Sequence, residues 1–130
     1  MSGEPRNKFG IQAADSVSIV GAPPMALDVL VRVAPNAVFT LEGRFDVVIA
    51  FLTRRAEFET MLPRILQALK KDSRLWTMYP NPRSLDDADL SRERGWAGLV
   101  REGYGEVEHV SFGDWFGIRW ASTQPRFGRR

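Results

Sequence analysis

Polar side chains that could hold a small ligand follow two apolar runs of the sequence. Gly21 and Ala22 come directly after the first run, and Tyr79, Asn81 and Arg83 lie at the end of a later one. If both runs are parallel strands, their carboxyl ends share one edge of a sheet, where open α/β sheets bind ligands. A phenol, an amide and a guanidinium could orient a small ligand there. The same residues are also typical of turns that follow strands.

Two further candidates, Asp114 and Trp115, lie in and directly after the Gly-Asp dipeptide of a predicted hairpin. They could take part in ligand binding, but such residues are more often a turn residue and an aromatic that packs on a sheet. His109 alternates with Val107 and Ser111 on one strand of this hairpin. A lone strand histidine is more often exposed or hydrogen-bonded than catalytic, so we assign no catalytic residue.

The residue types that are missing exclude several chemistries. The chain has no Cys, and His109 is its single histidine. This excludes a disulfide framework, a thiol nucleophile, a Cys-ligated zinc site and any site that needs two imidazoles. Carboxylates, Arg, Tyr, Ser, Thr and backbone groups remain for chemistry, and we predict no metal site.

The charge is unevenly distributed. The 130 residues include 18 Lys and Arg against 16 Asp and Glu, a formal net charge of +2. Three unopposed positive charges, Arg126, Arg129 and Arg130, lie in the last ten residues beside Phe127. Such a tail could contact phosphates and stack a base, but three charges give weak, salt-sensitive attachment. We expect a solvated tail and no nucleic-acid partner.

Length and hydropathy predict one folded unit. The chain is 44% hydrophobic, which is enough for one core, and it has no apolar run of about 18 residues that could span a membrane. The first residues lack the apolar segment of a secretory signal, so we expect a cytoplasmic protein. Residues 1–10 and 123–130 have no periodicity and are predicted to be tails around a domain at residues 11–122.

Strand and helix signals alternate along this domain. Apolar runs predict strands at residues 17–20, 45–52 and 74–79, and Gly113-Asp114 predicts a hairpin of residues 107–112 and 115–121. A first helix is predicted at residues 25–33. A second is predicted at residues 54–69, with Thr53 as its cap and a kink or restart at Pro63. A third is predicted to begin at Ser84 or Ser91 and to end near Gly103. The buried face of the last helix would be Trp96, Leu99 and Val100. This order predicts a three-layer α/β domain, a mostly parallel sheet with helices on both faces and a C-terminal antiparallel hairpin.

Residues 37–41 lean toward strand, but their place in the sheet is left open. Four residues, 42–45, separate them from the core of the next strand, whereas a parallel crossover needs a dozen or so. We therefore expect this stretch either to pair antiparallel with the following strand or to be an extended lead-in.

The second half of the sequence resembles a known fold. The strand at residues 45–51, the helix around Pro63 and the strand at residues 75–80 resemble the fourth strand, the following helix and the fifth strand of class I S-adenosylmethionine-dependent methyltransferases. The chain also resembles a small bacterial family of unknown function with cut-down methyltransferase folds, through the pattern Leu75-Trp76-x-x-Tyr79-Pro80 followed by Asp114-Trp115-x-x-x-Arg119-Trp120. The resemblance spans roughly residues 14–122. It implies a Rossmann-like domain without the third strand and its flanking helices.

Departures from the methyltransferase pattern concern the cofactor. A Rossmann-like cofactor site needs glycines after the first strand, but this turn is Gly21-Ala22-Pro23-Pro24, and its two prolines have no N–H to donate. Glu42 lies 21 residues after Gly21, at the spacing of the acid that binds ribose hydroxyls, although one acid at one spacing is a weak signal. Asn81 stands where the small family is expected to have lysine, and Arg83 could substitute for it.

These observations favour a methyltransferase-like domain that is non-catalytic and binds a protein partner or a small ligand, with no cofactor. The alternative is a minimal S-adenosylmethionine-dependent methyltransferase that uses the Gly21 turn and Glu42. The predicted ligand-binding residues are Gly21, Ala22, Glu42, Tyr79, Asn81, Arg83, Asp114 and Trp115.

Overall fold

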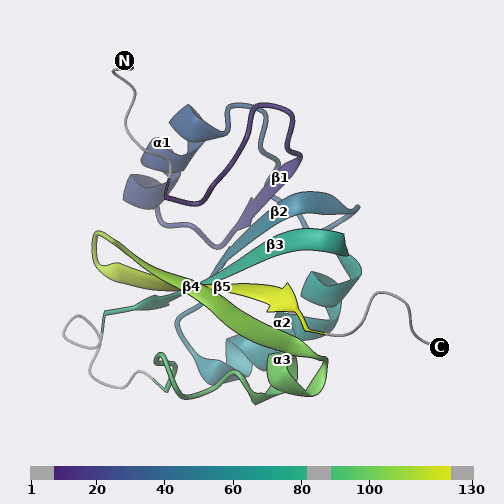
Figure 1. Cartoon of the computed structure of the whole chain (residues 1–130). Coiled ribbons are helices and arrows are strands. Elements are labelled where there is room, and N and C mark those ends of the chain that lie inside the picture. Colours follow the sequence, from purple (N-terminus) through teal and green to yellow (C-terminus); the bar gives the residue numbers. More distant parts are fainter. Residues whose placement is uncertain (1–7, 82–88, 124–130) are drawn as a thin grey trace.

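The computed structural model describes residues 8–81 and 89–123 (Figure 1). Within these ranges the chain forms β1 (Val17–Val20), α1 (Pro24–Val33), β2 (Phe45–Phe51), α2 (Arg55–Gln67), β3 (Leu69–Pro80), α3 (Ala97–Arg101), β4 (Tyr104–Phe112) and β5 (Trp115–Ser122). The strands make one sheet in the order β1-β2-β3-β5-β4. β1, β2 and β3 are parallel, whereas β5 is antiparallel to both β3 and β4. The predicted α/β sheet with a C-terminal hairpin is confirmed.

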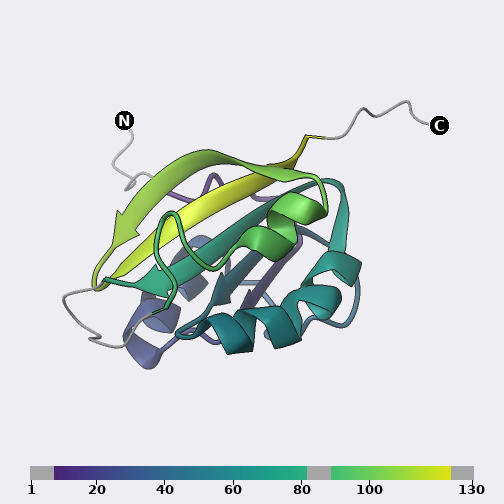
Figure 2. The same ribbon diagram turned by 90° about the horizontal axis from the view of Figure 1, so that it is seen from below.

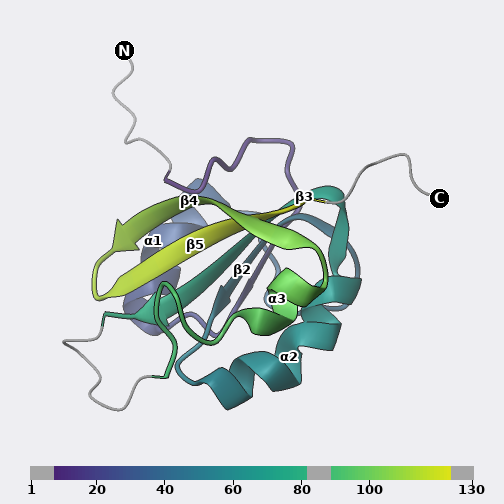
Figure 3. The ribbon, with the colours of Figure 1, turned by 60° about the horizontal axis from the view of Figure 1, so that its bottom comes forward.

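Helices cover both faces of the sheet and make three layers. α1 packs on one face, where Ala26 and Leu30 join a core cluster with Ile49 of β2. α2 and α3 pack on the opposite face, where Phe58 and Leu99 join a second cluster. Figure 3 views this second face with α1 behind the strands, and Figure 2 shows α2 and α3 lying beside each other on it.

β2 lies in the middle of the parallel strands, and its burial follows from that position. Every residue from Phe45 to Phe51 except Asp46 is buried. Its side chains alternate between the two core clusters, because both faces of the strand are covered by helices. The continuous apolar run that predicted a central strand therefore has a direct physical cause.

α2 differs from the predicted helix in its bounds, in its N-terminal cap and in its course through Pro63. It runs without a break from Arg55 to Gln67 through Pro63, so the predicted restart is wrong. The side chain of Thr53 does not cap it; instead the Glu57 carboxylate accepts a hydrogen bond from the Thr53 N–H (2.8 Å). Leu69, the last position of the predicted helical stripe, begins β3.

α3 is much shorter than predicted. It covers Ala97–Arg101, and the possible start at Ser84 lies outside the described residues. Gly95 has a φ of 102°, a left-handed conformation that a helix cannot contain, so a helix from Ser91 is excluded. Leu99 is buried as predicted, but Val100 is 61% exposed and does not belong to the core.

The N-terminal segment contributes to the core. Phe9 is buried, and its ring packs edge-to-face on Trp76 (5.1 Å between centroids) and on Phe112 (5.5 Å). Its carbonyl oxygen accepts a hydrogen bond from the Trp76 indole (3.2 Å). The tail predicted to extend to residue 10 therefore ends before Phe9.

Residues 37–41 pair with the sheet at one point. Val38 forms an isolated parallel bridge with Ser18 on the free side of β1. The Ser18 hydroxyl then donates to the Thr40 carbonyl oxygen (2.6 Å), and Leu41 is buried in the core cluster on the α2 face. The stretch is not a named strand and does not pair antiparallel with β2. Its single bridge is parallel and lies beside β1, a placement that the crossover argument had excluded for a full strand.

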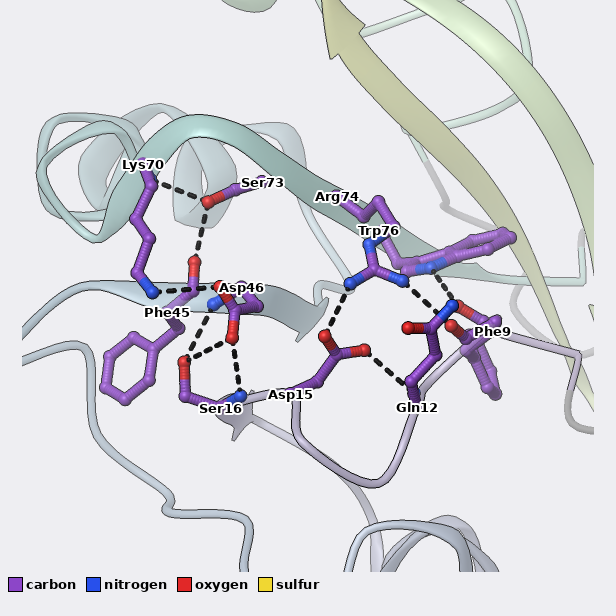
Figure 4. Close-up of polar contacts among 11 residues, drawn as sticks. Phe9, Gln12, Asp15, Ser16, Phe45, Asp46, Lys70, Ser73, Arg74 and Trp76 are labelled. Atoms are coloured by element: carbon purple, nitrogen blue, oxygen red, sulfur yellow. Dashed lines mark hydrogen bonds and ion pairs between the residues drawn. The ribbon is translucent and has the colours of Figure 1, made fainter.

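A polar network ties the amino ends of the three parallel strands together (Figure 4). The Asp46 carboxylate accepts hydrogen bonds from the Ser16 N–H and from Lys70 Nζ, both at 2.8 Å. Arg74 pairs with Asp15 at 2.8 Å and also donates to the Gly10 carbonyl oxygen. The polar groups that Figure 4 draws at this end bind one another and so hold the strands together.

Candidate functional site

The carboxyl edge of the sheet brings several predicted site residues together. Gly21 follows the end of β1, Asn81 follows β3, and Asp114 lies in the hairpin turn before β5. The Asn81 N–H donates to the Asp114 carbonyl oxygen (2.8 Å), which joins the end of β3 to the hairpin. The Trp115 ring packs edge-to-face on Phe51 at the end of β2 (5.0 Å). Figure 1 shows the hairpin tip reaching toward α1 at this edge.

Two predicted site residues do not join this group. Glu42 lies three residues before β2 begins at Phe45, so it belongs to the amino end of the strand. β2 is seven residues long and spans about 20 Å at the usual rise per residue. Glu42 is therefore remote from the Gly21 turn, despite its suggestive spacing. Arg83 lies outside the described residues.

The turn after β1 keeps the glycine that packing requires. Gly21 has a φ of 75°, and a Cβ added there would lie 2.5 Å from the Phe51 carbonyl oxygen. The absence of a side chain lets the turn lie directly on the end of β2. Ala26, five residues later, is buried where α1 meets the sheet, and its small side chain permits close approach of helix and strand.

The same turn lacks the residue that a ligand would require. In the Rossmann pattern Gly-x-Gly-x-x-Gly/Ala, the first glycine makes the tight turn, the second lets the backbone approach the ligand, and the third position allows close helix packing. Gly21 and Ala26 occupy the first and third positions, but Pro23 occupies the second. The two packing positions are thus retained, and the ligand position carries a rigid ring.

The start of α1 offers few hydrogen-bond donors. Pro23 and Pro24 have no N–H, and the Leu27 N–H donates to the Pro23 carbonyl oxygen (2.9 Å). In the first turn this leaves the N–H groups of Met25 and Ala26 to face a ligand. A helix N-terminus that binds phosphate or carboxylate groups normally presents more of them.

An apolar groove lies between the start of α1 and the hairpin. We call it the α1 groove; its volume is about 610 Å³, and its lining includes Pro23, Met25, Val29, Phe112 and Trp115. Met25 is 85% exposed and Val29 45% exposed, so both present apolar surface to solvent. Asp114 is the charged residue in the lining. The groove is suited to apolar contact and offers little for a polar cofactor.

Tyr79 belongs to the other side of the same edge. Its ring lies in the core cluster on the α3 face, 6.0 Å from the Trp96 ring and 5.9 Å from the Phe116 ring. It lines a separate hollow of about 380 Å³, which we call the Tyr79 pocket. Its other lining residues are Ser91, Arg92, Glu93, His109, Val110, Phe116 and Gly117.

The sequence pointed to Tyr79 but not to most of its neighbours. Arg92 and Glu93 stand in an irregular segment where the sequence offered a possible helix start, and no pattern places that segment over the sheet. His109 was considered only as a strand histidine; its Nε2 lies 2.9 Å from a carboxylate oxygen of Glu106. The signal that could have placed it is the hairpin register, which pairs His109 with Ile118 and so puts it on the α3 face.

Among the described residues no group of three or more His, Cys, Asp or Glu side chains could hold a metal ion. No helix in the described part of the chain is long and apolar enough to cross a membrane.

Comparison with known proteins identifies the fold. No family model and no curated protein matches the sequence. Among solved structures, a ribosomal protein L11 methylase from Lactobacillus delbrueckii subsp. bulgaricus is similar, with a TM-score of 0.58 and 10% identity over 88% of this chain and 73% of that one. The mitomycin 7-O-methyltransferase MmcR has a TM-score of 0.56 and 14% identity over 85% of this chain and 50% of its own. Fibrillarin, in its complex with Nop5p, has a TM-score of 0.52 and 13% identity, covering 86% and 74%.

These similarities establish the class I methyltransferase fold, in shortened form, and confirm the resemblance to that fold seen in the sequence. At such low identity they concern the fold alone. The resemblance to the small bacterial family stays a prediction. The chain spans half the length of MmcR, and beyond the single bridge at Val38 the described residues form no further strand outside β1.

Proposed function

We propose that this chain is a methyltransferase-like domain that binds a ligand and does not transfer methyl groups. The observation that carries the proposal is the turn after β1. Gly21 and Ala26 retain the packing roles of the Rossmann pattern, while Pro23 takes the position that would contact a cofactor. A packed sheet retained around an altered cofactor turn is expected of a domain that works by binding.

The residues present do not fit S-adenosylmethionine. A Cβ added at Gly21 would lie 2.5 Å from the Phe51 carbonyl oxygen, so the space that a side chain would take there is filled by protein. The first turn of α1 retains two N–H donors, and Glu42 lies at the amino end of β2, remote from that turn. No step of methyl transfer can be assigned to these groups.

A binding role is supported by the two hollows at the carboxyl edge. The α1 groove is almost wholly apolar, and nothing on that surface indicates the occupant. The Tyr79 pocket combines an apolar floor with charged and hydroxyl groups, which is the usual composition of a small-molecule site. Of the two kinds of occupant that the sequence leaves open, this favours a small ligand over a protein partner.

A thermal-shift assay on the full chain tests the absence of a cofactor. A ligand at a hundred times its dissociation constant stabilises the folded state by about 2.7 kcal/mol, which corresponds to a rise of about 10 °C in Tm for a domain of this size. We expect S-adenosylmethionine and S-adenosylhomocysteine at about 1 mM to shift Tm by less than about 1 °C. A clear shift, together with a methylated product in a transfer assay, would establish the minimal methyltransferase instead.

A further inference from the structure

The Tyr79 pocket contains a buried hydroxyl that no group of the described residues satisfies. Tyr79 is 4% exposed, yet its hydroxyl makes no hydrogen bond with any described residue. A buried hydroxyl without a partner is destabilising, and proteins tolerate one mainly where a water or a ligand completes it. Burial raises the pKa of Tyr79 above its ordinary value of 10.0, while the charge of Arg92 lowers it and those of Glu106 and Glu93 raise it. Tyr79 shares the lining of this pocket with Arg92 and Glu93.

Charges of both signs stand unpaired in this lining. Arg92 and Glu93 are exposed, and neither forms an ion pair with another described residue. Five other acidic residues of the described chain are paired with arginine or lysine, and Glu106 is within 2.9 Å of His109. In the described lining of the pocket, a cation and an anion without ion-pair partners thus stand beside a hydroxyl that can donate, and this suits a ligand that itself carries both charges.

The apolar floor of the pocket indicates the chemical nature of the uncharged part of the ligand. Phe116 lies 5.9 Å from Tyr79 between ring centroids and supplies the apolar ring of the lining, whereas the side chain of Val110, which also lines the pocket, packs on the α1 face. A flat apolar group stacked on Phe116 would bury its own surface and that of the ring. The volume of about 380 Å³ is at the small end of ligand pockets, which suits a compact molecule.

We propose that the Tyr79 pocket binds a free amino acid with an aromatic side chain. Arg92 and the Tyr79 hydroxyl donate hydrogen bonds to its carboxylate, Glu93 accepts from its ammonium group, and its ring packs on Phe116. This inference rests on the proposed binding function and names the class of ligand. It concerns residues on the α3 face, apart from the turn where the methyltransferase fold would hold a cofactor.

Isothermal titration calorimetry of the full chain with L-phenylalanine tests the proposal. We expect saturable binding with one site per chain. Two analogues each remove one charge: 3-phenylpropionate lacks the ammonium group, and 2-phenylethylamine lacks the carboxylate. Both should bind at least about tenfold more weakly, because hydrogen bonds to charged groups contribute that much or more. An absence of binding up to about 10 mM, or equal binding of either analogue, overturns the proposal.

Substitutions assign the contacts. Arg92→Gln and Tyr79→Phe should weaken L-phenylalanine at least about tenfold, whereas Arg94→Gln, on the same segment but outside the pocket lining, should leave affinity unchanged. Tyr104→Phe is the matched control for the tyrosine, because Tyr104 also packs against the core on the α3 face but does not line the pocket. Glu93→Gln should weaken the binding of L-phenylalanine and leave the affinity for 3-phenylpropionate, which has no ammonium group, unchanged.

The variants also separate this inference from the proposed function. Tyr79→Phe removes a hydroxyl that has no described partner, so we expect its Tm to stay equal to or above that of the wild type, and lost affinity cannot then be attributed to unfolding. If L-phenylalanine fails to bind while S-adenosylmethionine also fails, the ligand class proposed here is wrong and the non-catalytic function stands. If S-adenosylmethionine binds and is turned over, the proposed function itself fails.

Discussion

Replacing Gly21 with alanine tests whether the turn after β1 is built for packing. The substitution places a methyl group at a φ of 75° and 2.5 Å from the Phe51 carbonyl oxygen. Gly113 provides a matched control, because its φ is 62° and a Cβ there has no neighbouring atom within 4 Å. Both substitutions carry the cost of a left-handed alanine, and only Gly21→Ala adds the clash with β2.

The expected magnitudes follow from these two contributions. A left-handed conformation costs a non-glycine residue about 1 kcal/mol or slightly more. Forcing a group into packed space costs about 1–3 kcal/mol, and here the obstacle is backbone, which cannot swing away. Gly113→Ala should therefore lower the free energy of unfolding by about 1 kcal/mol and Gly21→Ala by about 3 kcal/mol.

Urea unfolding followed by tryptophan fluorescence measures the difference. With a slope of about 1.5 kcal/mol per molar, a typical value for small domains, the two midpoints should differ by about 1.3 M. Equal midpoints for the two variants would refute the reasoning, because they would mean that the Gly21 turn does not rest on the end of β2.

Two further substitutions test the core and the amino-end network. In urea unfolding, Thr77→Val should lower the free energy of unfolding by about 1–3 kcal/mol, because the buried indole N–H of Trp120 donates to the Thr77 hydroxyl (2.8 Å) and would lose its acceptor. The control Thr60→Val, on the exposed side of α2, should change it by less than about 0.5 kcal/mol. Equal effects of the two substitutions would contradict this role of Thr77. The hydrogen bond from Lys70 and those from Ser16 lower the pKa of Asp46 from 3.8 to about 2, so the ionised carboxylate stabilises the fold above about pH 4, and this contribution is lost as the pH falls through 2. Because Asp46 and Lys70 are partly exposed, we expect Asp46→Asn to lower the free energy of unfolding by about 1 kcal/mol at pH 7. The difference in stability between this variant and the wild type should shrink between pH 4 and pH 2. A difference independent of pH would show that the carboxylate charge is not responsible.

The elements of the fold could be predicted where burial dictates the residue pattern. The run from Phe45 to Phe51 is apolar because helices cover both of its faces, and the sequence carries that constraint directly. The helix that ends at Arg101 is shorter than predicted because Gly95, with a φ of 102°, cannot belong to it, and Val100 lies within the helix but on its exposed side. Residues 37–41 were hard to place because the rule on crossovers concerns full strands, and the chain passes β1 after a single bridge at Val38.

The candidate site could be predicted in part for a similar reason. Residues that end parallel strands must meet at one edge, so Gly21 and Asn81 were placed correctly by topology. Glu42 was proposed from its distance from Gly21 along the chain, and that distance does not tell at which end of β2 the residue lies. The pocket around Tyr79 could not be predicted in the same way. Residues 91–93 reach it through an irregular segment, and no periodicity in the sequence describes the path of that segment.

Titration of S-adenosylmethionine into the full-length chain, followed by isothermal titration calorimetry, is the most direct test of the central claim that the fold is retained while its cofactor turn is lost. We expect no saturable heat up to about 1 mM, because Pro23 occupies the position where backbone would approach the ligand and the first turn of α1 retains only two N–H donors. Saturable binding with a micromolar dissociation constant that weakens in a Glu42→Ala variant would contradict it.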